Sequence, residues 1–410
     1  LLPDDPNLSL QRGRIHEFFK YTKPHRKLLE QIELVIIDEI SMVRADIIDA
    51  IDRILRVYSH NLREPFGGKQ LLLVGDVFQL EPVVKNDERE ILNRFYPTPY
   101  FFSARVFGQI DLVSIELQKV YRQTDPVFVG VLDHIRNNTA GAADLQLLNT
   151  RYGSQIEESE ADMYITLATR RDTVDSINEK KLAELPGDPI TFEGVIEGDF
   201  PESSLPTSQE LVLKPGAQII FIKNDFDRRW VNGTIGVIAG IDEEEETIYV
   251  ITDDGKECDV KRESWRNIRY RYNEKTKEIE EEVLGSFTQY PIRLAWAITV
   301  HKSQGLTFSR VVIDFTGGVF AGGQAYVALS RCTSLDGIQL KKPINRADVF
   351  VRPEIVNFAG RFNDRQAIDK ALKQAQADVQ YAAASRAFDK GDMEECLEQF
   401  FRAIHIYNCS

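Results

Sequence analysis

The sequence predicts an α/β protein built from two doubly wound parallel-sheet domains, with a small β-barrel inserted in the second domain and an α-helical tail. Three observations support this prediction. Short apolar runs alternate with segments of helical periodicity in two separate parts of the chain, as in parallel sheets that helices cover. Between these parts, short strand-like runs are separated by tight turns. From about Asn363 the chain is alanine-rich and helical in pattern.

The first parallel sheet is predicted from residues 34–37 (Leu-Val-Ile-Ile) and 71–74 (Leu-Leu-Leu-Val). Runs of this length and composition suit strands that are buried on both faces. Between them, apolar residues recur at helical spacing and alternate with Asp and Arg, which predicts an amphipathic helix. The apolar positions of this helix are Ile47, Ile51, Ile54, Leu55 and Tyr58.

The second sheet is predicted from strands at 165–167 and 311–313, with a helix over 172–184 and another helix before the second strand. A polar, proline-containing linker spans 199–208. The inserted barrel is expected from the alternating runs that follow this linker. These runs lie at 218–222, 234–238 and 247–251, with turns at Asn232-Gly233 and 253–255.

The composition allows two or three domain cores, because the chain has 410 residues of which 43% are hydrophobic. No run approaches the roughly 18–20 apolar residues of a membrane span, so no membrane partner is expected. The net charge of −14 argues only mildly against a nucleic-acid partner. Much of the excess acid lies at 242–246 and 278–282, which are expected to be solvated turns.

The four cysteines, Cys258, Cys332, Cys396 and Cys409, show no CxxC spacing and no nearby paired histidines. A zinc site or a disulfide framework is therefore not expected, and a reducing, cytoplasmic setting fits best. The first residues have neither an initiator Met nor the layout of a signal peptide. We expect the chain to be a segment of a longer protein.

Two acids, Asp38 and Glu39, follow the first predicted strand. Open α/β sheets bind ligands at the carboxyl ends of their strands. Asp38 is therefore a candidate Mg²⁺ ligand, and Glu39 a candidate base for an attacking water. Alternatively, both acids cap the following helix. After the next strand, Gly75 would allow a tight turn and the Gln79 amide could sense a γ-phosphate, although an ordinary strand-to-loop turn is the alternative.

Three later segments carry basic or hydrogen-bonding side chains. Arg122 lies near the end of the first predicted domain, where an arginine can stabilise charge on a transferring phosphoryl group, although a surface salt bridge would also explain it. Residues 297–307 (AITVHKSQGLT) place hydroxyl, amide and basic groups before a strand, as in a loop that donates hydrogen bonds to a phosphate backbone. Arg331, in QAYVALSRC, is expected at a helix start, facing back across a domain cleft.

The order of the segments DEISM, GDVFQLEPV, VYRQ, TVHKSQG and YVALSRCTSLDG resembles that of superfamily-1 helicases, and their wording is similar to the Pif and RecD-type branch. Residues 213–224 and 231–236 are similar to the barrel that this branch inserts before its TVHKSQG loop. The resemblance covers roughly residues 30–345. It implies two RecA-like domains, ATP and Mg²⁺ as cofactors, and 5′-to-3′ movement along single-stranded DNA with unwinding at duplex junctions.

The resemblance also implies a role for each matching residue. Asp38 is expected to hold Mg²⁺, Glu39 to act as the catalytic base, and Gln79 to sense the γ-phosphate. Arg122 and Arg331 are expected to reach the same phosphate, the second from the other core domain. Nucleotide binding is further expected at Gly75, Asp76 and Gly305, with Gly305 in the loop that couples nucleotide to DNA. Nucleic-acid contacts are expected from Thr299, His301, Lys302, Ser303, Asn224 and Asn232.

The implied first RecA-like domain is partial. No GxxxxGK[ST] phosphate-binding loop occurs, because Gly67-Gly68-Lys69-Gln70 lacks the leading glycine and the hydroxyl residue and follows DEISM. That loop is expected before residue 1, so the isolated chain is expected to turn over no ATP. Glu81 stands where relatives often carry Pro, with little effect expected. The implied domains are 1–125, then 126–205 with 286–360, the barrel at 206–285 and the tail at 361–410, and residues 1–30 are expected to end a wedge region.

Residues 381–404 resemble one tetratricopeptide repeat, with a turn at Gly391-Asp392; a plain amphipathic hairpin is the alternative. One repeat cannot bury its own apolar face. We therefore expect that this face is covered by further repeats, by docking on the core or by a protein partner. The leading hypothesis is an ATP-dependent DNA helicase. The alternatives are a non-catalytic nucleic-acid- and protein-binding module derived from a helicase, and an RNA-acting superfamily-1 relative.

Overall fold

The computed structural model describes residues 21–154, 163–273, 275–276 and 278–408, so most of the expected wedge segment lies outside the described residues. The chain divides into two compact units. The larger comprises Leu1–Ala104 with Val120–Arg352, and the smaller comprises Arg105–Lys119 with Pro353–Ser410. Among the described helices, none has both the length and the apolar character that crossing a membrane requires.

In the described part of the larger unit, β1 (Leu34–Ile37) and β2 (Gln70–Leu73) pair as parallel neighbours, and α3 (Ala45–Tyr58) connects them. Both predicted strands are confirmed, but the expected burial on both faces is wrong. Ile36 is 59% exposed and Leu72 47% exposed. Because side chains alternate between the faces of a strand, this pattern leaves one face of the pair open among the described residues.

An amphipathic helix is expected to turn its polar side toward solvent. The polar side of α3 instead makes contacts within the protein. Asp49 accepts a hydrogen bond from the Tyr96 hydroxyl at 2.8 Å. Asp52 accepts from the Phe66 backbone N–H at 2.6 Å and from Arg56 Nε at 2.8 Å. These bonds offset the desolvation of the buried carboxylates. The surrounding elements are α2 (Lys23–Gln31), α4 (Asn86–Phe95), η3 (Pro65–Gly68) and η4 (Phe101–Ser103).

A second parallel sheet has the strand order β14-β3-β15-β16. Its inner strands β3 (Ile165–Ala168) and β15 (Val311–Asp314) are buried along their whole length, and the predicted helix over 172–184 is α7 (Arg171–Glu184). The helix expected before Val311 is not formed. Residues 300–305 make successive turns instead, because Gly305 adopts a φ of +79°, which helices exclude. The other elements are β14 (Ala297–Thr299), β16 (Ile338–Leu340), α5 (Pro126–Arg136), α6 (Ala142–Asn149), α8 (Gln324–Ser330) and η7 (Arg346–Asp348).

The inserted region forms an antiparallel sheet with the order β10-β9-β8-β7-β13. The three predicted runs are its strands β7, β8 and β9, which pack around an apolar core of their own, while Ile220 of β7 and Ile235 of β8 belong to the core of the second parallel sheet. Two strands upstream of residue 206 pair with this region, β4 with β6 and β5 with β12. The strands are β4 (Ile190–Glu193), β5 (Val195–Gly198), β6 (Glu210–Leu213), β7 (Gln218–Phe221), β8 (Ile235–Asp242), β9 (Thr247–Thr252), β10 (Glu257–Val260) and β13 (Ile292–Leu294), with η6 (Glu202–Ser204) between β5 and β6.

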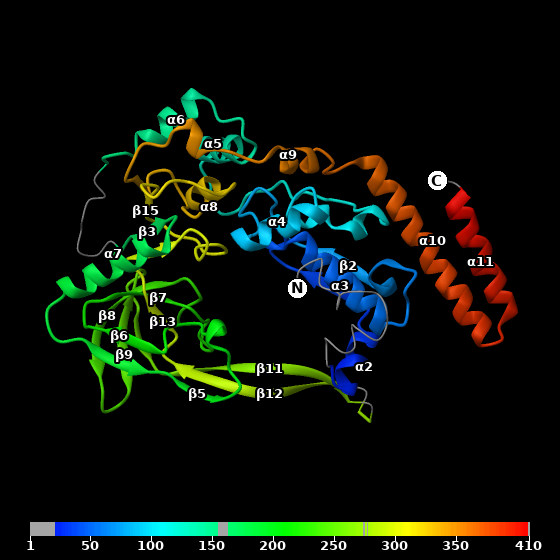
Figure 1. The fold of residues 1–410 in the computed structure, drawn as a ribbon, viewed down its shortest axis with the longest axis horizontal. Coiled ribbons are helices and arrows are strands. Elements are labelled where there is room, and N and C mark those ends of the chain that lie inside the picture. Colours follow the sequence, from blue (N-terminus) through cyan, green and yellow to red (C-terminus); the bar gives the residue numbers. More distant parts are fainter. Residues whose placement is uncertain (1–20, 155–162, 274, 277, 409–410) are drawn as a thin grey trace. The chain divides into compact units, whose positions relative to one another are not determined.

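Two long strands, β11 (Glu263–Asn273) and β12 (Glu278–Gln289), form an antiparallel ribbon that extends from this sheet and contacts α2 (Figure 1). The acidic stretch 278–282 was expected to be a solvated turn, and that expectation is wrong. It lies in β12, where Glu282 faces Arg269 across the ribbon. Opposite charges on facing positions favour such strand pairing. In the other acidic stretch, 242–246, residues 243–246 form the expected turn.

In the smaller unit, α10 (Arg365–Asp389) and α11 (Met393–Asn408) pack against each other as a helical hairpin (Figure 1). Gly391 makes the predicted turn with a φ of +78°. The segment 105–119 joins this unit through Asn363, whose backbone N–H donates to the Ser114 carbonyl at 3.0 Å. The helical tail is thus observed, while its likeness to a tetratricopeptide repeat remains a prediction. The unit also contains η5 (Arg105–Gly108) and α9 (Pro353–Ala359).

Candidate active site

The carboxyl ends of β1 and β2 lie side by side, and the first predicted site residues follow them. Glu39 adopts a left-handed backbone conformation at φ 51° and ψ 44°, and the short turn η2 (Ile40–Met42) comes next. Gly75 packs against this turn: a Cβ there would lie 2.9 Å from the Ile40 nitrogen, so only glycine fits. Asp38 is exposed, and its Oδ1 accepts the Glu39 N–H at 2.8 Å. Neither η2 nor α3 is capped by a side chain, so the helix-capping alternative is wrong.

Gln304 links these strand ends to the loop that follows β14. Its Nε2 donates to Glu39 Oε2 at 2.8 Å and to Gln79 Oε1 at 3.2 Å. Residues from three distant segments of sequence therefore meet in one hydrogen-bond network. The Gln304 Oε1 atom is buried and has no hydrogen-bond partner among the described residues. A carbonyl oxygen in that position is suited to accept a bond from a water or hydroxyl group.

Asp76 connects the end of β2 to α5. Its carboxylate lies 3.3 Å from Arg136 Nη2 and 3.4 Å from Arg136 Nε, and it also accepts the Phe78 N–H at 3.1 Å. The Arg136 guanidinium lies over the Phe78 ring at 4.4 Å. Asp76 therefore already has a cationic partner from the protein, and this contact fixes the course of the chain that carries Gln79.

Arg122 contacts the region of the second parallel sheet. Its Nε donates to Thr307 Oγ1 at 2.9 Å and its Nη1 to the Ser330 carbonyl at 3.4 Å, while Gln123 Nε2 donates to the same carbonyl at 2.9 Å. These partners are uncharged oxygens, so the surface salt bridge is not what holds Arg122. Burial lowers the pKa of its guanidinium, because removal from water disfavours the charged form.

Arg331 lies at the end of α8, where it is the C-cap residue, so the expectation of a helix start is wrong. The helix begins at Gln324 because Gly323, with a φ of +80°, turns the chain into it. Arg331 is 1% exposed, and its donors reach the Val327 carbonyl at 3.1 Å and Ser330 Oγ at 3.1 Å. Burial and the nearby Arg122 guanidinium lower the pKa of Arg331 to about 10.

The loop before α8 packs closely on the segment after β2. A Cβ on Gly323 would lie only 2.2 Å from the Gln79 carbonyl oxygen. Glu81 accepts the Tyr100 hydroxyl at 2.7 Å and the Gly322 N–H at 3.3 Å, and it pairs with Arg352 at 3.5 Å. Glu81 was expected to have little effect, yet it joins three segments of the larger unit.

The loop expected to contact nucleic acid follows β14. Thr299 Oγ1 accepts the Lys302 N–H at 3.2 Å, and the buried Ser303 hydroxyl donates to the Val300 carbonyl at 2.8 Å. Burial lowers the pKa of His301, which favours the neutral imidazole. The pKa of Lys302 is also lowered, by burial and then by the positive charges of two arginines. Gly305 is exposed at the end of the loop.

The two asparagines expected to bind nucleic acid lie on the connection between β7 and β8. Asn224 Oδ1 accepts the Asn232 N–H at 2.7 Å, and both residues are exposed. This connection abuts the loop after β14, since a Cβ on Gly233 would lie 2.8 Å from Leu306 Cδ2. The structure therefore brings the two groups of expected nucleic-acid residues next to each other.

Three residues of this site were missed by sequence reasoning: Gln304, Thr307 and Gln123. Each stands inside or beside a segment that was singled out, so the available signal was a hydrogen-bonding side chain within such a segment. Pattern alone gave no reason to prefer Gln304 over Ser303. The difference comes from packing, which buries the Ser303 hydroxyl and aims the Gln304 amide at Glu39.

The residues gathered here fit a magnesium–nucleoside triphosphate. Mg²⁺ is commonly held by one or two carboxylates together with phosphate oxygens and water, and Asp38 offers an exposed carboxylate. Arg122 and Arg331 repel each other electrostatically. An anionic phosphate between them would stabilise both charges.

Comparison with known proteins agrees with this site. The model of the PIF1-like helicase family matches residues 15–135. The ATP-dependent DNA helicase Pif1 of Campylobacter jejuni is 33% identical over 329 residues, which cover 77% of this chain and 70% of that protein. The human ATP-dependent DNA helicase PIF1 is 34% identical over 312 residues, covering 75% of this chain but only 45% of the human protein.

Solved structures give the same result. Bacteroides sp. Pif1 in complex with ADP-AlF4 superposes with a TM-score of 0.77 at 39% identity, covering 88% of this chain and 80% of that one. Bacteroides Pif1 bound to single-stranded DNA gives a TM-score of 0.62 at 39% identity, over 85% and 79% of the two chains. The predicted α/β fold with RecA-like domains is thereby confirmed. The chain belongs to the Pif1-like family of ATP-dependent DNA helicases.

Proposed function

We propose that this chain is part of an ATP-dependent DNA helicase that moves 5′ to 3′ along single-stranded DNA and opens duplex junctions. The observation that carries the proposal is the pair of hydrogen bonds from Gln304 to Glu39 and Gln79. Gln304 belongs to the loop that also carries His301 and Lys302, so the residues assigned to hydrolysis and those assigned to DNA share one network. Bacteroides Pif1 structures with ADP-AlF3 and single-stranded DNA support the same pairing of ligands.

In the proposed mechanism each residue acts at a defined atom. Asp38 would hold Mg²⁺, which neutralises charge on the phosphate oxygens. Glu39 orients the attacking water through its carboxylate and takes up the proton. Gln79 and Gln304 donate or accept hydrogen bonds around this water. Arg122 and Arg331 stabilise the charge on the transferring phosphoryl group, since a positioned arginine is effective where water is excluded.

Coupling to DNA follows from the position of Gln304. When nucleotide is bound, contacts at Glu39 and Gln79 hold Gln304 and with it the loop 300–305. Loss of those contacts after hydrolysis frees the loop, and hinge-type closure and opening of the two core regions then moves the strand. The close packing of Gly323 on the Gln79 carbonyl is a second connection through which the same motion reaches Arg331.

We also propose that the isolated 410-residue chain does not hydrolyse ATP. The 410-residue sequence has no GxxxxGK[ST] loop, whose backbone N–H groups and lysine cradle the phosphates. The chain also spans less than half of the human relative. We therefore expect ATP turnover only from the protein expressed from its complete reading frame.

The test compares Glu39→Gln with Glu33→Gln in that complete protein. Glu33 is exposed just before β1, at the opposite end of the strand from Glu39, and makes a matched control. Glu39→Gln should bind nucleotide nearly as well as the parent protein but lower DNA-stimulated kcat by roughly 10²- to 10⁴-fold, because it removes the base and keeps the metal ligand. Glu33→Gln should leave kcat unchanged.

Near-normal turnover of Glu39→Gln would contradict the role of Glu39. No hydrolysis by the complete parent protein, with or without single-stranded DNA, would favour the binding-module alternative. Equal stimulation by single-stranded RNA would favour the RNA-acting alternative.

A further inference from the structure

One aromatic side chain of the inserted sheet projects into solvent. Phe226, on the connection between β7 and β8, is 96% exposed. Its aromatic neighbours in sequence behave differently: Trp230 is 5% exposed and stacks on the buried Phe221 with ring centroids 4.3 Å apart. The core of this region is therefore complete without Phe226, and burial in the fold does not explain the ring.

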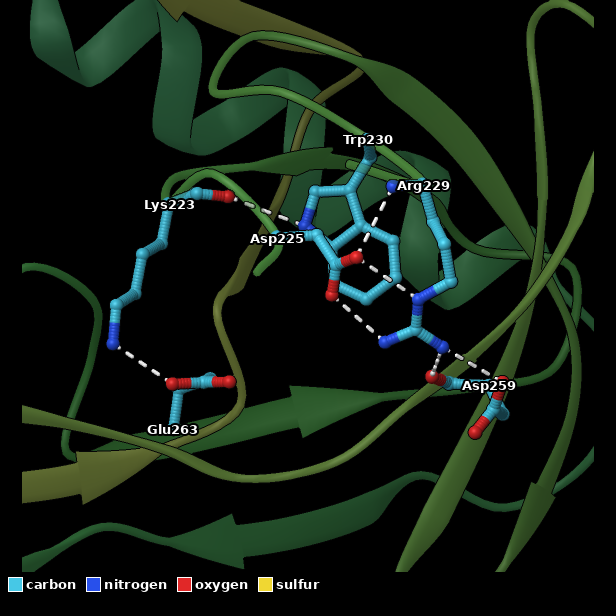
Figure 2. Close-up of polar contacts among 6 residues, drawn as sticks. All are labelled: Lys223, Asp225, Arg229, Trp230, Asp259 and Glu263. Atoms are coloured by element: carbon cyan, nitrogen blue, oxygen red, sulfur yellow. Dashed lines mark hydrogen bonds and ion pairs between the residues drawn. The ribbon is translucent and has the colours of Figure 1, made fainter. Parts of the chain in front are cut away.

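The backbone on both sides of Phe226 is held by a network of charged side chains (Figure 2). Arg229 donates to both carboxylate oxygens of Asp225, at 2.8 and 3.0 Å, and to Asp259 Oδ1 at 2.8 Å. The Arg229 guanidinium lies 4.6 Å from the centre of the Trp230 ring. A bidentate arginine–carboxylate pair fixes geometry more firmly than a single bond.

Two further bonds close the loop. The Asp225 N–H donates to the Trp230 carbonyl at 3.2 Å, and the Arg228 N–H donates to the Asp225 carbonyl at 3.2 Å. Lys223 is held in turn by Glu263, 2.8 Å away. Phe226 therefore stands at the tip of a turn that is already ordered, so a ligand would not have to order the backbone on binding.

The same network decides which chemistry the loop can offer. Lys223 and Arg229 are neutralised by Glu263, Asp225 and Asp259, so these cations are not available to attract phosphates. Of the exposed residues at the tip, Asp227 and Arg228 have opposite charges. What remains is the flat apolar face of Phe226, with the amide of the exposed Asn224 beside it in sequence. This combination suits a nucleobase, which presents a π-face and hydrogen-bonding edges, better than a phosphate.

The loop also lies next to the segment proposed to contact DNA. Its far end, at Asn232-Gly233, packs on Leu306, which follows directly on the loop of His301 to Gly305. Because Gly233 contacts Leu306, a strand bound along the loop of His301 to Gly305 passes close to the connection that carries Phe226.

We infer that Phe226 is a stacking platform for a nucleobase of single-stranded DNA, outside the ATP site. The inference rests on the proposed helicase function. Stacking is tolerant of sequence because every base has a π-face, which suits a protein that moves along DNA.

The experiment uses the complete protein and a forked duplex with a 5′ single-stranded tail, in which the junction fixes the register. The dissociation constant is measured by fluorescence anisotropy for Phe226→Ala, Phe226→Trp and the control Phe388→Ala. Phe388 is also an exposed phenylalanine, at 59%, but lies on α10 in the smaller unit. Phe226→Ala should weaken binding by roughly 5- to 100-fold, the range for loss of one base–aromatic stack, while Phe226→Trp and Phe388→Ala bind like the parent.

Two readouts separate stacking from general damage. The slope of log Kd against log salt should not change in Phe226→Ala, because no phosphate contact is lost. A single abasic site, moved along the tail, should weaken binding of the parent at one position and have no effect there in Phe226→Ala, as expected for two groups that interact.

The inference would be overturned if Phe226→Ala bound DNA as tightly as the parent protein. It would also be overturned if the effects of the abasic site and of the substitution were additive at every position. Either result would leave the helicase function intact. A parent protein that binds no single-stranded DNA would overturn both.

Discussion

Replacing Arg331 by Met is expected to stabilise the chain while removing the activity. Arg331 is 1% exposed, and burial together with Arg122 lowers its pKa to about 10. Because the pKa in the folded chain lies below that in the unfolded chain, the folded state disfavours the charged guanidinium. This penalty is fully present below about pH 10 and is relieved as the pH rises through about 10 toward the higher pKa of the unfolded chain.

The size of the effect follows from the same values. The lowering of the pKa from the ordinary value of an arginine to about 10 corresponds to about 3 kcal/mol against the charged form at neutral pH. Methionine fills a similar volume without charge, but it leaves the Val327 and Leu306 carbonyls without their donors from Arg331. We therefore expect Arg331→Met to raise the free energy of unfolding by about 1–3 kcal/mol, the range found when apolar residues replace buried charges.

The assay is urea unfolding of the 410-residue chain at pH 7, followed by circular dichroism, with Arg94→Met as the matched control. Arg94 is exposed on α4, so its substitution should change the free energy of unfolding by less than about 0.5 kcal/mol. In the complete protein, Arg331→Met should lower DNA-stimulated kcat by roughly 10³-fold or more if Arg331 has its proposed role of stabilising charge in phosphoryl transfer.

A Met variant that is less stable than the parent by more than about 1 kcal/mol would refute this reasoning. Arg331 would then serve the fold as a hydrogen-bond donor, and its burial would need no functional explanation. A stabilised but fully active variant would refute the catalytic assignment instead.

Two further substitutions test how the larger unit is held together. Asp52→Ala should lower the free energy of unfolding by about 3–5 kcal/mol, because it removes this partner of the buried Arg56 charge and of the Phe66 N–H. The control Asp175→Ala removes an exposed pair with Arg171 and should change the free energy of unfolding by less than about 0.5 kcal/mol. Urea unfolding measures both variants, and equal effects would contradict the role of burial. Glu81→Leu should lower the free energy of unfolding by about 1–3 kcal/mol, because it removes the hydrogen bond from the Tyr100 hydroxyl to Glu81. Glu81→Gln keeps an acceptor oxygen and should have a clearly smaller effect, also measured by urea unfolding. Equal losses would show that the negative charge matters more than the hydrogen bond.

The secondary structure of the cores was accessible to sequence reasoning because it depends on local pattern. The runs at 34–37 and 165–167 became β1 and β3, and the turn at Gly391 separates the last two helices. The acidic stretch 278–282 was placed wrongly because its neighbours in sequence suggest solvent. In the structure the stretch pairs with β11, where Tyr270 faces Glu281 and Arg269 faces Glu282, and only strand pairing brings these residues opposite each other.

Burial was predicted less well than secondary structure. Ile36 is apolar and exposed, while Asp49 and Asp52 are charged and buried. Hydrophobicity describes the free energy of transfer of a side chain alone, whereas a carboxylate with partners such as Tyr96 or Arg56 can be buried at little cost. Partners distant in sequence cannot be recognised from local composition.

The sequence by itself determined the order of the chemical segments, and with it the family and the candidate roles of Asp38, Glu39, Gln79, Arg122 and Arg331. These follow from the resemblance of the ordered segments to a known family, which the chain carries whatever its conformation. Only the tertiary structure decided that Gln304 joins Glu39 to Gln79, that Arg331 ends a helix in a buried position, and that Phe226 is left in solvent. Those facts depend on contacts between segments up to 265 residues apart, and such contacts are set by packing of the whole fold and not by any local pattern.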